Sequence, residues 1–141
     1  MDKAWLLADG APLEKSLITI RKNYDPRLPP VEADAAALLR AFLNVTRNAV
    51  QMMPAGGTVT ITTRRNEEEA EVVIADTGPG IAPEVLPAIF APFVSHRPDG
   101  TGLGLAATQR IIVEHGGRVE AQSEIGKGAR FIFHLPLKAD D

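Results

Sequence analysis

Two glycine clusters decide the fold of this chain: Asp76-Thr77-Gly78-Pro79-Gly80 and Gly100-Thr101-Gly102-Leu103-Gly104-Leu105. An apolar run at residues 72–75 leads into the first cluster, and a segment with helical spacing follows the second. Glycine has no side chain to keep a ligand away from the backbone. We therefore expect a pocket walled by main chain, with the loop between the clusters as its lid.

The overall composition excludes several kinds of site and partner. The chain has 141 residues, of which 45% are hydrophobic, enough for the core of one domain. It has no cysteine, so it can form neither a disulfide nor a thiolate metal site. The net charge is -3 with scattered Lys and Arg, and no apolar run approaches the roughly 18 residues of a membrane span. We expect a cytoplasmic domain that contacts neither nucleic acid nor membrane directly, whether or not its parent protein is anchored in a membrane.

Periodicity and capping residues predict the secondary structure. Apolar residues at helical spacing follow Asp34, a good N-cap, and end before Pro54. Alternating apolar and polar residues predict two hairpins, the first with a four-residue turn and the second with His134 facing solvent. The expected strands are residues 17–22, 58–65, 70–75, 118–121 and 130–135, and the expected helices are residues 35–53, 83–90 and 103–115.

The order of these elements predicts the fold class. A strand, a helix, a hairpin, a loop, a helix and a second hairpin fit an α/β (α+β) sandwich of two layers. We expect a mixed, mostly antiparallel sheet covered on one face by about three helices. The domain should occupy residues 15–138, with a tail or linker at residues 1–14 and a short tail at residues 139–141.

Asp76 ends the strand that leads into the first glycine cluster. A carboxylate there needs a hydrogen-bond donor, because burying an unpaired charge is costly. An adenine amino group is one suitable donor. The alternative, an N-cap or Asx-turn that only shapes the loop, is about equally compatible with these residues.

The second cluster and its approach suggest a phosphate site. Alternate glycines at residues 100–104 open a helix, whose first N–H groups favour anions, although a flexible hinge would have the same sequence. The spacing matches neither the Rossmann fingerprint nor a Walker P-loop. His96 and Arg97 precede it, where a cation could meet a terminal phosphate or simply lie on a surface loop.

Three amide side chains lie on one stripe of the long helix. Asn44 and Asn48 are four residues apart, and Gln51 is three further on. An amide oxygen is a hard ligand suited to Mg²⁺, whereas a solvated helix face is the simpler explanation for any two asparagines alone.

Taken together, the motifs resemble those of the GHKL (Bergerat-fold) superfamily over residues 15–138. The resemblance lies in the N box at residues 44–49, the G1 box at 76–81, the F box at 89–93, the G2 box at 100–105 and the terminal glycine motif at 126–131. Their order and spacing are similar to those of the catalytic, ATP-binding domain of bacterial two-component sensor histidine kinases, of the nitrogen-regulator sensor type.

The resemblance implies a role for each matching residue. Asn48 would coordinate Mg²⁺, Asp76 would bind the adenine amino group, and Arg97 would lie near the γ-phosphate. The other implied nucleotide-binding residues are Asn44 and Gln51 on the phosphate side, Gly78, Gly80 and Ile81 around the base, Phe90 and Phe93 as lid anchors, and Gly100, Thr101, Gly102, Leu103, Gly104 and Leu105 around the phosphates.

Two departures from the superfamily narrow the function. Its ATPases carry a glutamate as general base four residues before the Mg²⁺ asparagine, whereas this chain has Asn44, an amide that cannot accept the proton. Nothing resembles the phosphoacceptor segment either, since His115 follows Glu114 and precedes two glycines.

We therefore expect transfer of the γ-phosphate of ATP to a histidine of a separate dimerisation domain, with a response regulator downstream. The alternatives are a GHKL-type ATPase or protein-serine kinase, and a non-catalytic nucleotide-binding module.

Overall fold

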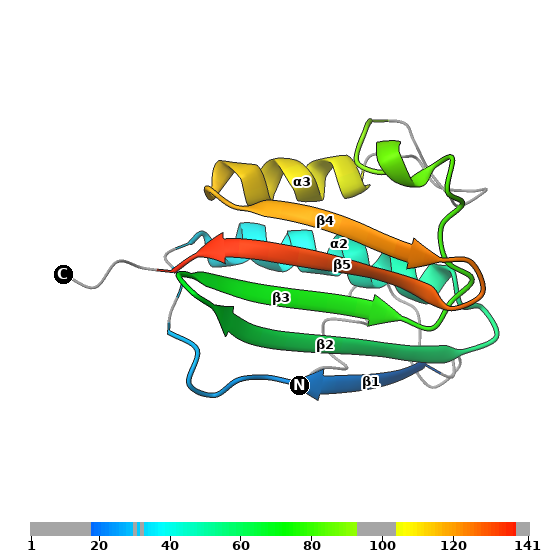
Figure 1. The fold of residues 1–141 in the computed structure, drawn as a ribbon, viewed down its shortest axis with the longest axis horizontal. Coiled ribbons are helices and arrows are strands. Elements are labelled where there is room, and N and C mark those ends of the chain that lie inside the picture. The colour runs from blue at the N-terminus through cyan, green and yellow to red at the C-terminus, as the bar shows by residue number, and fades with distance from the viewer. Residues whose placement is uncertain (1–17, 30, 32, 93–103, 138–141) are drawn as a thin grey trace.

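A computed structural model describes residues 18–29, 31, 33–92 and 104–137 of the chain (Figure 1). In chain order, the elements are β1 (Ile18–Asn23), α2 (Ala35–Gln51), β2 (Gly57–Asn66), β3 (Glu69–Asp76), the 3-10 helix η3 (Leu86–Ala88), α3 (Gly104–Glu114), β4 (Arg118–Glu124) and β5 (Gly128–Pro136).

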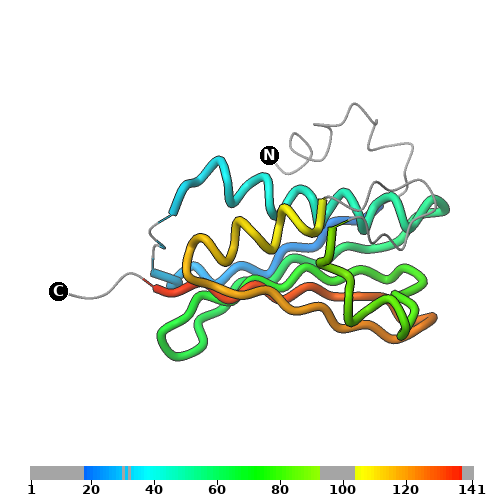
Figure 2. Tube along the Cα trace, turned by 90° about the horizontal axis from the view of Figure 1, so that it is seen from above, coloured from blue at the N-terminus to red at the C-terminus, as the bar shows by residue number. Residues whose placement is uncertain are grey.

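The strands form one five-stranded sheet in the order β1-β2-β3-β5-β4. β1 runs parallel to β2, and the other neighbours are antiparallel. Figure 1 shows α2 and α3 on one face of this sheet, and the view in Figure 2 separates the helical layer from the sheet. The predicted two-layer sandwich with a mixed, mostly antiparallel sheet is confirmed.

The described part of the chain contains two α-helices and one 3-10 turn rather than about three helices. The helix predicted at residues 83–90 is reduced to η3, because Pro87 has no N–H to donate within a longer helix. α2 ends at Gln51, two residues before the predicted end, and Asp34 caps its start by accepting a hydrogen bond from Ala37 N at 3.1 Å.

The core lies between the sheet and the two helices. The side chains of Phe131 and Phe133 on β5 are fully buried there, and the ring of Phe133 meets that of Phe42 on α2 edge to face at 5.1 Å. Val45 of α2 and Ile112 of α3 are also fully buried. Both helices thus belong to one core, with α2 packed against β2 and β3, and α3 packed against α2 and β4.

The first hairpin has a tighter turn than predicted. Asn66 pairs with Glu69, so the turn contains only two residues, and Glu67 adopts a φ of 57°. The predicted four-residue turn was too long because it included Asn66 and Glu69, which pair with each other as the last pair of the ladder. Two positions before this pair, Arg64 of β2 lies opposite Glu71 of β3 and forms an ion pair with it.

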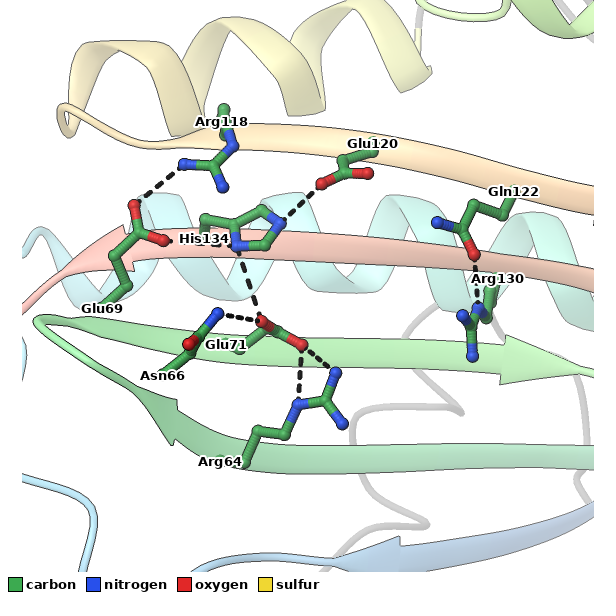
Figure 3. A network of polar contacts seen from close by, with 9 residues as sticks. All are labelled: Arg64, Asn66, Glu69, Glu71, Arg118, Glu120, Gln122, Arg130 and His134. Carbon is green, nitrogen blue, oxygen red and sulfur yellow. Dashed lines mark hydrogen bonds and ion pairs between the residues drawn. The ribbon is translucent and has the colours of Figure 1, made fainter.

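The face of the sheet away from the helices carries a network of polar contacts (Figure 3). His134 of β5 is only 5% exposed, and its Nε2 lies 2.8 Å from Glu120 Oε2. Its Nδ1 lies 3.5 Å from Glu69 Oε1 and 3.7 Å from Glu71 Oε2. The prediction that His134 faces solvent was therefore wrong, because long side chains on the adjacent strands cover it.

Glu71 is the buried acid of this network, with 3% of its surface exposed. Arg64 donates to its Oε1 from Nε at 2.7 Å and also from Nη2, and Asn66 Nδ2 donates to Oε2 at 3.3 Å. Burial raises the pKa of Glu71, but the hydrogen bond and charge of Arg64, the bond from Asn66 and the nearby His134 together hold that pKa below its ordinary value.

Candidate functional site

The ends of three elements meet at one edge of the sandwich. Figure 1 shows the end of β3, the end of α2 and the start of α3 at the same side of the molecule. β3 ends at Asp76, α2 ends at Gln51, and α3 begins at Gly104. The first glycine cluster, the amide stripe and the last part of the second cluster, which are distant in sequence, are therefore brought together.

Asp76 is held in place by two backbone amides. Its Oδ1 accepts hydrogen bonds from Gly78 N at 2.9 Å and from Ala129 N at 3.2 Å. The first bond is the Asx-turn considered as an alternative, and the second ties the side chain to β5. Asp76 therefore forms the Asx-turn. Both of these bonds use Oδ1, so the Asx-turn does not conflict with recognition of a base by the same carboxylate.

The two glycines of the first cluster are required by close neighbours. A Cβ at Gly78 would lie 3.1 Å from both Met53 Cγ and Asp76 Oδ1. Gly80 has a φ of +84°, and a Cβ there would lie 2.7 Å from the carbonyl oxygen of Glu124. The loop therefore passes directly against the end of α2 and against the β4–β5 turn. Ile81, which follows, is buried.

A second set of contacts, not foreseen from the sequence, anchors the loop to β2 and to Met53, which lies just beyond the end of α2. Thr77 N donates to Thr58 O at 3.2 Å, and Thr58 N donates to Thr77 Oγ1 at 3.0 Å. Thr77 Oγ1 also lies 3.7 Å from Met53 Sδ. Nothing in the spacing of these residues indicated the contacts, because they depend on how the end of α2 packs on the start of β2.

The amide stripe of α2 reaches the start of α3. Asn48 is 7% exposed, and Asn44 is half-buried and donates from Nδ2 to the carbonyl oxygen of Gly104 at 3.1 Å. Gln51 is exposed at the last turn of the helix. Asn44 and Asn48 thus lie within the fold, so the solvated-face explanation fits only Gln51.

Of the other predicted site residues, the structure describes Phe90 and Leu105. Phe90 packs edge to face on Phe131 with 5.9 Å between ring centroids, and Leu105 in the first turn of α3 is buried. The predicted site residues outside the described part of the chain are Phe93, Arg97, Gly100, Thr101, Gly102 and Leu103.

Comparison with known proteins identifies the family. A model of the histidine kinase-, DNA gyrase B- and HSP90-like ATPases matches residues 33–139. The chain belongs to this family. The sensor histidine kinase ZraS of Klebsiella oxytoca is 40% identical over 121 residues, which are 85% of this chain and 26% of that protein. Sporulation kinase C of Bacillus subtilis (strain 168) is 40% identical over 126 residues, which are 89% of this chain and 29% of that protein.

Solved structures place the chain more narrowly within the family. The mycobacterial sensor histidine kinase MprB superposes with a TM-score of 0.76 at 31% identity, covering 87% of this chain and 86% of that one. The nucleotide-free catalytic domain of histidine kinase ThkA gives 0.81 at 29% identity, covering 96% and 89%. Full-length ShkA in complex with AMPPNP gives 0.81 at 33% identity, covering 99% of this chain and 31% of ShkA. The chain is therefore a catalytic domain of the sensor histidine kinase type, as its motifs predict.

Two further facts concern the length of the chain relative to its relatives and the character of its helices. The chain spans between a quarter and a third of the length of ZraS and sporulation kinase C. In the described part of the chain, none of the helices is both long and apolar enough to cross a membrane.

Proposed function

We propose that the chain binds Mg²⁺-ATP and transfers the γ-phosphate to a histidine of a separate dimerisation domain in its parent sensor kinase. The observation that carries the proposal is the meeting of Asp76, the buried amide of Asn48 and the start of α3 at one edge of the sandwich. A base-recognising carboxylate, a metal ligand and an anion-binding helix start are the groups that a nucleoside triphosphate requires.

Asp76 would receive the amino group of adenine, with Gly78, Gly80 and Ile81 forming the walls around the base. At the other end of the nucleotide, the N–H groups of the first turn of α3 would face the phosphates. Gln51 would lie on the phosphate side of the pocket, and Phe90 would anchor its lid. The undescribed residues Phe93, Arg97, Gly100, Thr101, Gly102 and Leu103 would complete it, as the family motifs imply.

The residues present fit Mg²⁺. Asn48 offers an amide oxygen from a nearly buried position on α2, and Mg²⁺ favours one or two protein oxygens combined with phosphate oxygens and waters. Bound there, the ion would neutralise phosphate charge. Asn48 would orient the triphosphate by fixing this end of it.

The protein's part in phosphoryl transfer is positioning rather than proton transfer. Asn44 lies where the superfamily's ATPases carry a glutamate, and its amide donates to Gly104 O instead of accepting a proton. We therefore expect slow hydrolysis by the chain alone. The acceptor histidine would come from the dimerisation domain, and a response regulator would take the phosphate from it.

The test is transfer between separate proteins. The chain is incubated with [γ-³²P]ATP, Mg²⁺ and the purified cognate dimerisation domain, and a variant of that domain with its acceptor histidine replaced by glutamine is the control. We expect acid-labile label on the native acceptor and none on the control. Rapid phosphate release without labelling would favour the ATPase, and tight ATP binding with neither reaction would favour a regulatory module.

A further inference from the structure

The turn between β4 and β5 holds the loop that carries the proposed base site. Gly126 N donates to the carbonyl oxygen of Pro79 at 2.9 Å, and Gly80 passes so close that a Cβ would lie 2.7 Å from Glu124 O. A Cβ on Gly128 would collide with the carbonyl oxygen of Asp76. The hairpin turn and the loop at residues 76–81 are therefore packed main chain against main chain.

One side chain of the hairpin adds direct hydrogen bonds. Ser123 Oγ accepts from Ile81 N at 2.6 Å and donates to Ile81 O at 3.4 Å, although the two residues are 42 positions apart. The side chain of Ile81 is itself buried. Ser123 thus fixes both polar backbone groups of the residue at which the loop leaves the base site.

The other end of the same loop is fixed by the next strand. Ala129 N donates to Asp76 Oδ1 at 3.2 Å, so β5 sets the direction of the carboxylate while Ser123 of β4 holds the far end of the loop. A loop held at both ends has fewer conformations to lose when a ligand binds, and preorganisation of this kind raises affinity.

We propose that Ser123 is a positioning residue for nucleobase recognition: through Ile81 it holds the loop so that Asp76 meets an adenine base rather than a guanine base. The proposal rests on the nucleotide-binding function proposed above and assigns part of its base selectivity to β4. Ser123 itself need not touch the nucleotide.

The experiment compares Ser123→Ala, which removes the hydroxyl, with Ser123→Thr, which keeps it. Dissociation constants are measured by calorimetry for adenosine, Mg²⁺-ATP and Mg²⁺-GTP. Leaving Ile81 N without its partner should weaken ATP and adenosine binding by the same factor, about five- to tenfold, and reduce the preference for ATP over GTP. Ser123→Thr should restore both affinities. Because the effect lies in the base site, the ratio of the ATP affinity to the adenosine affinity, which reports the phosphate contacts, should not change.

A matched control lies on the same strand. Glu120→Gln alters a β4 side chain that contacts His134 on the open face of the sheet, and it should leave base preference unchanged. The proposal would be overturned if Ser123→Ala kept the preference for ATP over GTP. It would also be overturned if the variant bound adenosine normally and lost only the extra affinity that the phosphates give to ATP. If the unmodified chain binds no nucleotide, the proposed function fails and this inference with it. If it binds ATP while Ser123→Ala behaves normally, only the inference fails.

Discussion

Replacing Asp76 by asparagine tests the proposed base site with the smallest possible change. The two side chains have the same shape, and the amide oxygen of asparagine can accept the hydrogen bonds that Gly78 N and Ala129 N now donate to Oδ1. These two bonds determine the orientation of the new side chain. Its oxygen must take the place of Oδ1, and its NH₂ group must therefore take the place of Oδ2.

The magnitude follows from that orientation. If the adenine amino group donates to Oδ2, the variant presents a donor to a donor, so the whole charge-assisted bond is lost rather than weakened. A hydrogen bond to a charged group contributes about 1.5–3 kcal/mol, so the affinity should fall about 10- to 150-fold. The fold itself should be little changed, because both backbone amides keep an acceptor.

Calorimetric titration with ADP and with Mg²⁺-ATP measures the loss, and urea unfolding checks that Asp76→Asn remains folded. Asp34→Asn is a matched control, since it makes the same chemical change at the N-cap of α2, where aspartate and asparagine cap equally well. Affinity within twofold of the unmodified chain for Asp76→Asn would refute the adenine role of Asp76 and leave it only its structural hydrogen bonds from Gly78 N and Ala129 N.

Three further predictions concern the metal, the polar network and the core. Asn48→Ala should weaken ATP binding in Mg²⁺ but not in EDTA, and equal losses in both buffers would contradict a metal role. Arg64→Ala should lower the free energy of unfolding by about 1–2 kcal/mol at pH 7, because Arg64 is partly exposed while its partner Glu71 is buried. Since the folded-state pKa of Glu71 is depressed, that stabilisation is present above its ordinary value of 4.5 and is lost as the pH falls through the lower folded-state value; a penalty independent of pH in urea titrations would refute the ionic explanation. Phe133→Leu should cost about 1–3 kcal/mol by the same assay, through lost volume and the lost ring contact with Phe42, and a loss below 0.5 kcal/mol would show that the core repacks.

The sequence predicted the fold where local chemistry and tertiary packing agree. Asp34 and Pro54 bracket α2 because a cap and a missing N–H act within one turn of the chain. The alternation of Phe131 and Phe133 predicted the buried face of β5, since apolar side chains on a sheet with one covered face must point toward the helices.

The same alternation failed on the other face of the sheet. It assigned His134 to solvent because a polar residue between Phe133 and Leu135, which both face the helices, points away from the core. The side chains of Glu120 and Glu71 from the two neighbouring strands instead bury the imidazole. Strand order and register determine which side chains lie beside one another across a sheet. His134 is buried because β5 lies between β3 and β4, and the sequence alone did not indicate this strand order.

The candidate site divides in the same way. Its motif residues could be proposed from the sequence because glycines, an aspartate and asparagines at fixed spacing carry their chemistry locally, and their roles stay predictions. Ser123 was not, because its role exists only once the β4–β5 turn is folded against Ile81, 42 residues away. The two glycines that follow it, Gly126 and Gly128, predicted a turn, but they did not indicate which segment that turn packs against.

Asn44 links the architecture of the site to the reaction that the family comparison favours. A carboxylate at this position could accept a proton from water, but it could not donate a hydrogen bond to the carbonyl oxygen of Gly104 as the amide does at 3.1 Å. The amide therefore joins α2 to the first residue of α3, whose N–H groups would face the phosphates, and at the same time leaves this position without a general base. A pocket built this way orients a triphosphate well and activates water poorly. Such a combination suits an enzyme whose acceptor arrives on another domain, because ATP is then held for transfer instead of being hydrolysed between encounters.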